Sequence, residues 1–438
     1  MKSLVLLLFV TAIHAKHEQY SGWKSFYVNP VSFDQLSKLT SKIQEFHLDF
    51  FRKAAVNREG IVLVEPKYQN DFLKFLAKEK ISNRIHSDDL KERFDIDDQK
   101  IEARKLATRS INCGRLPYDN YQTLDVIYEY IDKIAEDYPE IVTLVSSSKS
   151  FQGRPLKYLK ISKDKFASNK PIIYIDAGIH AREWITIPTV TYAIHKLVEN
   201  VTEPDLLDNF DWILFPVVNP DGYVFSYERD RMWRKNRSLK DWSITSFFCR
   251  GVDGNRNFNF LWNTVGSDDD KCSPIYAGTK PFSESESRTV GEIIDEHVDR
   301  MVLFITVHSF GSMILYPWGN NGSLSHNAFS LHTVGIDMAD AINRLSLPHF
   351  PNYVVGNSML TLGYGTSGAA EDYAHYRGVP LTYTFELPGF ENEDDESNEF
   401  SEGFSLDPIY IHQVCVETWA AFVIGARRAG DLFGRKNL

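Results

Sequence analysis

The chain has 438 residues, which at roughly 150 residues per domain predicts two or three domains. Hydrophobic residues make up 43% and charged residues 24%, so the composition excludes wholesale disorder. With 48 Lys and Arg against 59 Asp and Glu, the formal net charge of −11 disfavours nucleic-acid binding. No apolar run reaches roughly 18 residues, and we therefore expect no membrane span.

The N-terminus, residues 1–15, has the pattern of a secretory signal peptide. Lys2 precedes the apolar stretch Leu4–Val10, and small residues follow as far as Ala15. We expect cleavage near Ala15 and a secreted, extracellular protein; a buried N-terminal strand or helix is the alternative. Three Asn-X-Ser/Thr triplets fit a secretory route: Asn200, Asn236 and Asn321.

Secretion permits disulfides, and four cysteines allow three pairings. Cys249 and Cys272 bracket a Gly-, Asp- and Ser-rich stretch, which is consistent with a stapled surface loop. Cys113 and Cys415 are then either a long-range pair or two free thiols.

Residues 16–109 are predicted to be a small α+β domain of the ferredoxin-like type, in the order βαββαβ. The predicted strands are Trp23–Val28, His47–Phe51, Gly60–Val64 and Asn83–His86. One amphipathic helix follows Ser32, and a second carries Phe72, Leu73, Phe75 and Leu76 on one face.

The charge-rich stretch 88–109 is predicted to be a connecting helix or linker. It ends in the basic residues Arg104, Lys105 and Arg109. Exposed segments between compact units are where proteases cut, which indicates a pro-segment removed by a trypsin-like protease. An ordinary interdomain linker is the alternative.

Residues 110–438 alternate between predicted strands and helices. We expect one α/β domain whose large mixed β-sheet is covered by helices on both faces. The predicted strands are Leu156–Ile161, Ile172–Ala177, Trp212–Val217, Val302–Val307 and Leu381–Phe385. The predicted helices are Trp184–Glu199, Ser285–Val298, Thr333–Leu345 and Tyr410–Arg427.

Polar residues follow three of these apolar strands. His180 and Glu183 come after the second strand, His308 follows the fourth, and Glu386 follows the fifth. Open α/β sheets place their sites at the carboxyl ends of strands, where these side chains can converge. Two His and one Glu form the ligand pattern of catalytic zinc, although a lone His-x-x-Glu occurs by chance.

Two further clusters are basic or rich in Asn. Arg231–Arg237 is basic within an acidic chain, and Asp253–Asn257 contains another arginine. Arginine binds carboxylates through two parallel hydrogen bonds, so these segments suit an anionic ligand beside a metal. Surface ion pairs are the alternative.

Five motifs together carry a resemblance to a known family. They are GIHAREW (Gly178–Trp184), WRKNRS (Trp233–Ser238), GVDGNRNF (Gly251–Phe258), HS (His308-Ser309) and YTFEL (Tyr383–Leu387). The chain resembles the secreted pancreatic-type zinc carboxypeptidases of the A/B subfamily, as a full-length preproenzyme. The resemblance implies a monomeric exopeptidase, made as an inactive zymogen, that acts on peptide and protein C-termini.

The same resemblance implies a role for each matching residue. His180, Glu183 and His308 would ligate one Zn²⁺, Glu386 would be the general base and acid, and Arg234 would polarise the scissile carbonyl. Asn255, Arg256 and Tyr364 would hold the terminal carboxylate, Arg182 and Ser309 would join the substrate-binding residues, and Asp253 would orient a ligating His.

Glu371 falls at the family's specificity position, where an acidic residue accompanies C-terminal Lys or Arg. A buried carboxylate facing an apolar side chain would be left unpaired, which favours a cationic substrate. The family's usual acid is Asp. The alternatives are an A-type preference for aromatic or aliphatic residues, or a Glu371 that turns to a structural partner beside Asp372.

Two other classes of protein fit the sequence less well. Gly363–Gly368 matches the dinucleotide fingerprint G-x-G-x-x-G, but no strand–turn–helix context surrounds it. A non-catalytic binding protein on the same scaffold would require a missing ligand or base, and the sequence lacks none of them.

Overall fold

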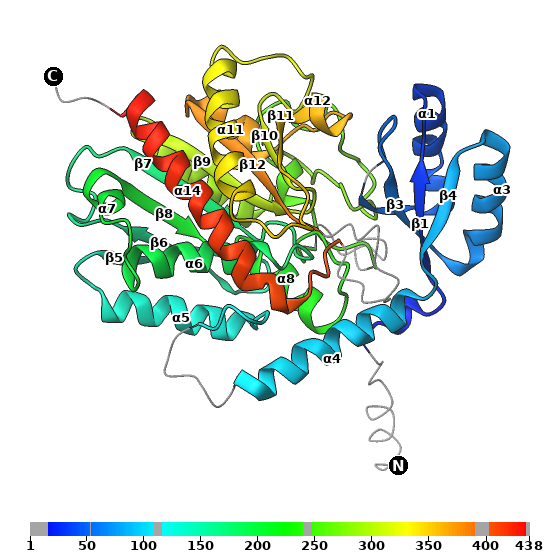
Figure 1. Ribbon diagram of the computed structural model, residues 1–438, viewed down its shortest axis with the longest axis horizontal. Coiled ribbons are helices and arrows are strands. Elements are labelled where there is room, and N and C mark those ends of the chain that lie inside the picture. The colour runs from blue at the N-terminus through cyan, green and yellow to red at the C-terminus, as the bar shows by residue number, and fades with distance from the viewer. Residues whose placement is uncertain (1–15, 53, 109–115, 240–247, 390–402, 435–438) are drawn as a thin grey trace. The chain divides into compact units, whose positions relative to one another are not determined.

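The computed structural model describes residues 16–52, 54–108, 116–239, 248–389 and 403–434 (Figure 1). The predicted signal peptide, Arg109, Cys113 and the acidic stretch 391–399 lie outside these ranges. Two compact units are present. The first contains the described residues up to Glu102 together with Tyr227–Arg231, and the second contains the described residues of Ala103–Ser226 and Met232–Leu438.

The first unit confirms the predicted ferredoxin-like arrangement. Its elements are β1 (Lys24–Asn29), α1 (Phe33–Ser41), α2 (Ile43–Phe46), β2 (Asp49–Arg52), β3 (Gly60–Val64), α3 (Gln69–Glu79) and β4 (Ser82–Ser87), followed by α4 (Leu90–Thr108). The antiparallel sheet has the order β2-β3-β1-β4. Ser32 begins α1 by accepting a hydrogen bond from the Gln35 backbone N–H. Phe26, Val62 and Phe72 lie in the hydrophobic core of this first unit.

The second unit is built on an eight-stranded mixed sheet. Its strands are β5 (Val142–Lys149), β6 (Pro155–Ile161), β7 (Ile172–Ala177), β8 (Asp211–Phe215), β9 (Met301–Ser309), β10 (Met313–Tyr316), β11 (Val354–Asn357) and β12 (Leu381–Leu387). The order is β11-β10-β12-β9-β7-β8-β6-β5, and the four neighbours β12, β9, β7 and β8 run parallel. The carboxyl ends of these parallel strands therefore lie at the same end of the sheet, where the predicted ligands His180, Glu183 and His308 are found.

Helices cover both faces of this sheet, as predicted (Figure 1). The helices are α5 (Leu124–Asp137), α6 (Thr186–Val198), α7 (Asp205–Asn209), α8 (Pro220–Glu228), α10 (Ser285–His297), α11 (Ala328–Asn343), α12 (Ser358–Leu362), α13 (Ala370–Arg377) and α14 (Ile411–Phe433). α14 packs against α6 and α11, whereas α10 packs against α13. Within the described residues, Pro408–Phe433 is the one helix long and apolar enough to cross a membrane, and 61% of its most apolar window is buried, as in a core helix.

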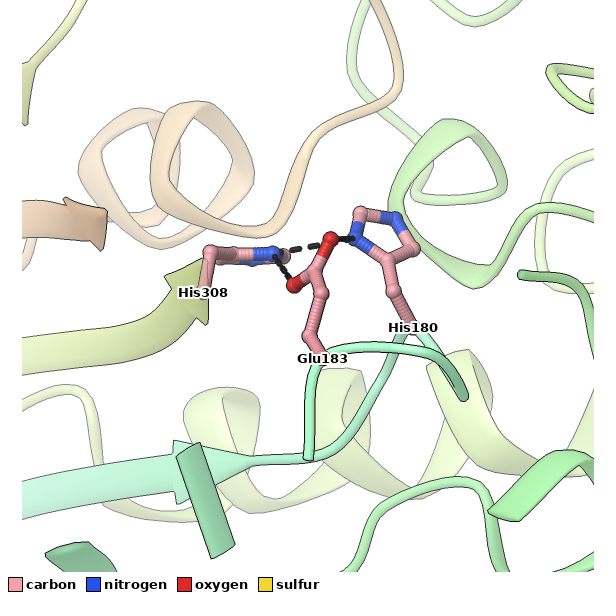
Figure 2. Close-up of side chains that lie close together, drawn as sticks. All are labelled: His180, Glu183 and His308. Atoms are coloured by element: carbon pink, nitrogen blue, oxygen red, sulfur yellow. Dashed lines mark hydrogen bonds and ion pairs between the residues drawn. The ribbon is translucent and has the colours of Figure 1, made fainter. Parts of the chain in front are cut away.

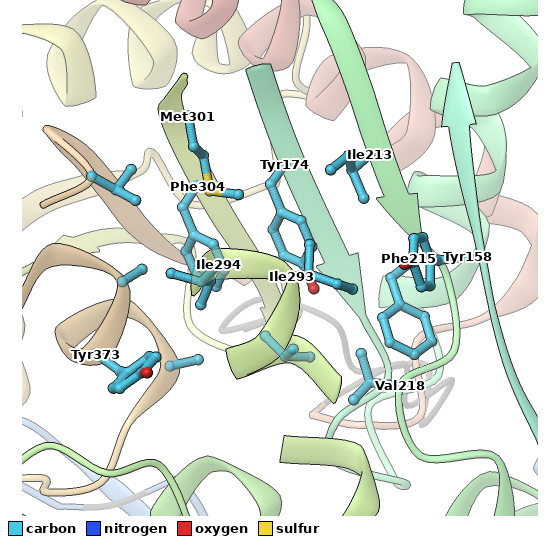
Figure 3. Packing of buried hydrophobic residues seen from close by; sticks show 14 of the residues in the cluster. Tyr158, Tyr174, Ile213, Phe215, Val218, Ile293, Ile294, Met301, Phe304 and Tyr373 are labelled. Atoms are coloured by element: carbon cyan, nitrogen blue, oxygen red, sulfur yellow. The ribbon is translucent and has the colours of Figure 1, made fainter. Parts of the chain in front are cut away.

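A buried cluster joins the central strands to α10 and α13 (Figure 3). The rings of Tyr174 on β7 and Phe304 on β9 stack with centroids 4.8 Å apart and planes 2° apart. Ile293 and Ile294 of α10 and Tyr373 of α13 belong to the same cluster. This packing holds β7 and β9 in the register that positions the polar residues at their ends.

Three strands were missed by the sequence analysis. β10 is apolar but, like β11, has only four residues, and β5 at the end of the sheet has mixed burial and a polar second half, so none gives a long apolar run. α6 begins at Thr186 and not at Trp184, because residues before it form turns that carry His180 and Glu183.

The predicted disulfide between Cys249 and Cys272 is present. Cys415 is buried in α14 and is unpaired among the described residues. Its predicted alternative partner, Cys113, lies outside them.

Candidate metal centre and active site

Three neighbouring parallel strands bring the predicted ligands together. After β7, the chain turns at Gly178, whose φ of +67° favours glycine, and passes through His180 and Glu183 before α6. His308 lies near the end of β9, directly opposite Glu386 on β12. The order β12-β9-β7 therefore places all four residues at one sheet edge.

The carboxylate of Glu183 lies between the two imidazoles (Figure 2). Its Oε1 is 2.9 Å from Nδ1 of His180, and its Oε2 is 3.0 Å from Nδ1 of His308. The two Nδ1 atoms are themselves 3.0 Å apart. The backbone N–H of Ser309 donates to Glu183 Oε2 at 3.3 Å and fixes the carboxylate.

These three buried residues fit a metal ion. One ligand atom from each lies within 4.8 Å of the others, and two imidazole nitrogens with one carboxylate oxygen are donors that suit zinc. Despite burial, the two imidazoles hold the pKa of Glu183 well below its usual value. Burial opposes the shift at His308, but the Glu183 carboxylate raises the pKa of His308 to about 9. The two imidazoles thus keep the Glu183 carboxyl ionised.

Asp253 connects the cluster to Arg234. Its Oδ1 is 3.0 Å from His180 Nε2, and its Oδ2 accepts hydrogen bonds from Nε and Nη2 of Arg234 at 3.0 and 2.9 Å. Burial would raise the pKa of Asp253, but the charges of Arg234 and His180 hold it well below its usual value. Asp253 was predicted to orient a ligating His, whereas its ion pair with Arg234 was not predicted, because no local sequence pattern indicates it.

Arg256, the predicted carboxylate-binding arginine, donates hydrogen bonds to backbone carbonyls. It is 6% exposed, its Nε donates to the Gly266 carbonyl at 2.8 Å, and its Nη1 donates to the Asn255 carbonyl at 2.7 Å. Both acceptors are neutral, and no described carboxylate forms an ion pair with Arg256. Asn255 is fixed beside it, since its Oδ1 accepts from the Ala370 N–H at 2.8 Å. A desolvated arginine without a counter-ion favours a carboxylate ligand.

The remaining predicted substrate residues lie around this centre. Tyr364 follows α12 and is close enough to Arg234 to contribute to its raised pKa, which burial opposes and Asp253 chiefly supports. The guanidinium of Arg182 lies 4.4 Å from the ring centroid of Phe404 and 3.5 Å from the Met232 carbonyl. Ser309 is buried, and its Oγ has no hydrogen-bond partner in the part of the chain that the structure describes.

The surroundings of Glu386, the predicted general base and acid, shift the pKa of its carboxyl. Burial and the nearby charge of Glu183 raise the pKa of Glu386 to about 8, although His308 and Arg234 oppose the shift. A carboxyl with a pKa near the working pH can both accept and return a proton.

Glu371 lies in the first turn of α13 and is 4% exposed. Among the described residues, no hydrogen-bond partner lies within reach of its Oε2. Burial raises the pKa of Glu371, although its own backbone N–H, the charges of His308 and Arg256 and the nearby Thr384 hydroxyl oppose the shift. The neighbouring Asp372 instead accepts from the Gly319 N–H at 3.0 Å, so it is Asp372 that turns to a structural partner.

Comparison with known proteins identifies the family. Residues 127–421 match the zinc carboxypeptidase family, and residues 26–97 match the carboxypeptidase activation peptide. The chain belongs to the zinc carboxypeptidases. It is 54% identical over 435 residues to a carboxypeptidase B of Helicoverpa zea, covering 99% of this chain and 100% of that one.

Two more relatives show the range of names within the family. A carboxypeptidase B of Astacus astacus is 39% identical over 274 residues, covering 62% of this chain and 88% of its own. The crystal structure of a carboxypeptidase A from Helicoverpa armigera superposes with a TM-score of 0.89 at 40% identity, covering 95% of this chain and 100% of that one. The chain is therefore a metallopeptidase with an activation peptide, and its relatives include both B- and A-type enzymes.

Proposed function

We propose that this zinc carboxypeptidase releases single C-terminal residues from peptides and proteins, with one zinc ion bound by His180, Glu183 and His308. The convergence of these ligands with Glu386 at one sheet edge carries the proposal. Arg256, which forms no ion pair with a described carboxylate, supports exopeptidase action, because a chain end offers an α-carboxylate that a residue within the chain lacks.

The protein's own groups have distinct tasks in this reaction. His180, Glu183 and His308 would hold the zinc, which would supply the Lewis acidity that makes water a nucleophile at neutral pH. Glu386 accepts a proton from the attacking water and returns it to the leaving amine, which requires a carboxyl whose pKa lies near the working pH.

Two arginines bind different negative charges of the substrate. Arg234 has Nη1 3.6 Å from Glu183 Oε1, and we assign it to the oxygen of the scissile carbonyl as negative charge develops there. Arg256 and Asn255 hold the terminal carboxylate, with Tyr364 contributing from the loop after α12. Arg256 therefore binds the chain end, whereas Arg234 stabilises the transition state.

We further propose a preference for C-terminal Lys or Arg, set by Glu371. Its Oε2 is buried without a partner, and a substrate cation would compensate that charge. The naming of the Helicoverpa zea relative as a carboxypeptidase B supports this preference. An A-type preference for aromatic or aliphatic residues is the second candidate, because the structurally similar enzyme from Helicoverpa armigera is named a carboxypeptidase A.

We propose secretion as a zymogen that is cleaved near Arg109. The match to an activation peptide over 26–97 and the signal-like residues 1–15 support this route. The activating protease would cut after a basic residue, as trypsin does.

Hydrolysis of blocked dipeptides ending in Arg, Phe or Glu tests the proposed function. We expect trypsin treatment of the precursor to give release of Arg that a zinc chelator abolishes and added zinc restores. Release of Phe without Arg would contradict the Lys/Arg preference. Chelator-insensitive release, or none from any peptide, would contradict the metallopeptidase mechanism.

The secretory route also predicts which Asn-X-Ser/Thr triplets carry glycans. Asn200 and Asn321 are exposed, whereas Asn236 is 2% exposed and its Nδ2 donates to Glu284 Oε2 at 2.8 Å. We expect glycans at Asn200 and Asn321 only, because a glycan cannot fit on a buried amide. Peptide mass spectrometry after enzymatic deglycosylation in heavy-oxygen water would label the occupied sites. A folded, active enzyme labelled at Asn236 would contradict the prediction.

A further inference from the structure

A row of polar side chains lies on the sheet face behind the proposed metal site. Asp176 on β7 is the direct register partner of Thr306 on β9, and His308 follows Thr306 by two residues. Tyr174 precedes Asp176 by two residues, and side chains two apart on a strand share a face. Asp176 and Thr306 are both fully buried among otherwise apolar strand residues.

These groups form one chain of hydrogen bonds. Thr306 Oγ1 donates to Asp176 Oδ1 at 2.7 Å, and the Tyr174 hydroxyl donates to Asp176 Oδ2 at 3.0 Å. Thr306 Oγ1 is also 3.2 Å from Nε2 of His308. A hydroxyl has one hydrogen, and that of Thr306 is directed at Asp176, so Thr306 accepts from His308. In the neutral imidazole that a metal requires, Nε2 of His308 therefore carries the hydrogen, which leaves a lone pair on Nδ1.

The two sides of the His308 ring thus have different partners. Nδ1 points to Glu183 Oε2, at 3.0 Å, and into the proposed metal site. His180 has a similar arrangement, except that its Nε2 contacts the Asp253 carboxylate directly at 3.0 Å. Nε2 of His308 instead contacts the Thr306 hydroxyl, and that hydroxyl in turn contacts the carboxylate of Asp176 on the neighbouring strand.

We propose that Thr306 and Asp176 are positioning residues that hold His308 in the tautomer and orientation needed to ligate the metal. The proposal rests on the metal site proposed above. Metal-ligating histidines commonly donate their other N–H to a fixed acceptor, and loss of that acceptor weakens metal binding about 10–100-fold. Asp176 accepts the hydrogen of the Thr306 hydroxyl, so the Thr306 oxygen can only accept a hydrogen bond from His308. This role explains why a carboxylate is buried at this position.

A valine substitution at Thr306 tests the proposal, because it removes the hydroxyl and keeps the β-branched shape. Thr382 on β12 offers a matched control. It is fully buried opposite Phe304 of β9, and its hydroxyl has no hydrogen-bond partner among the described residues. We expect T306V to raise the zinc dissociation constant about 10–100-fold, measured by competition with a chromophoric chelator. T306S should restore most of the affinity, and T382V should leave it unchanged.

Unchanged zinc affinity in folded T306V would overturn the proposal, as would an equal loss in T382V. If T306V does not fold, NMR of the unsubstituted protein with ¹⁵N-labelled histidine decides the matter. We expect His308 to show a slowly exchanging proton on Nε2, and a proton on Nδ1 in the zinc-loaded protein would overturn the proposal. H308A separates the two hypotheses: if zinc affinity survives that change, the metal site itself is wrong.

Discussion

Substitution of Glu386 by Gln is expected to leave zinc binding intact and to lower kcat by about 10²–10⁴-fold, the contribution typical of a positioned general base and acid. Glutamine preserves the shape of the side chain but cannot accept a proton. Because Glu386 lies opposite His308 in the strand register and is not among the three grouped ligands, the metal should stay bound.

The measurement pairs kcat for a C-terminal Arg peptide with the zinc content of the purified variant. Glu417 on α14 provides the control, since it is also fully buried, and burial raises its pKa to about 7. It bonds to Ser346 and Gln413, away from the ligands, so E417Q should retain its kcat. Wild-type turnover in E386Q would remove the proposed base, and loss of zinc would place Glu386 among the ligands.

The main features of the fold and of the site could be predicted because both depend on local pattern. The apolar runs that become β7, β9 and β12 are continuous, as expected of strands buried on both faces. Polar residues at the ends of such strands must gather if the strands are parallel neighbours. His180, His308 and Glu386 could therefore be placed at one sheet edge before their distances were known.

What could not be predicted depends on long-range register and packing. The ion pair of Arg234 with Asp253 joins two loops whose approach no spacing reports. Asp176 and Thr306 look like ordinary strand residues in the sequence, and only the pairing of β7 with β9 sets them side by side. The same holds for Asn236, whose triplet indicates a surface glycan although its side chain is buried.

Substitution of Glu371 by Gln is expected to lower kcat/KM for peptides ending in Lys or Arg by about 10²–10³-fold, which corresponds to loss of one partner of a buried ion pair, about 3–4 kcal/mol. The amide keeps the volume and removes the charge. Release of C-terminal Leu or Phe should be unchanged or faster, because the cost of burying a carboxylate against an apolar side chain disappears.

E371D is the matched control, because it keeps the carboxylate on a shorter side chain, that of the family's more usual Asp. It should keep the preference for basic residues, so that the ratio of Arg to Leu release separates charge from shape. If E371Q releases Arg as fast as the unsubstituted enzyme does, Glu371 does not contact the substrate, and the A-type alternative gains support.

The pH dependence gives a second test of the same carboxyl. Burial raises the pKa of Glu371 in the free enzyme, and only the ionised form attracts a cation. As pH rises through that raised pKa, kcat/KM for Arg peptides should therefore increase, while kcat/KM for Leu peptides lacks this step. The bound cation stabilises the carboxylate, so the step should appear in kcat/KM and shift to lower pH in kcat. E371Q should abolish the difference between the two profiles; a difference that persists in E371Q would assign the step to another group.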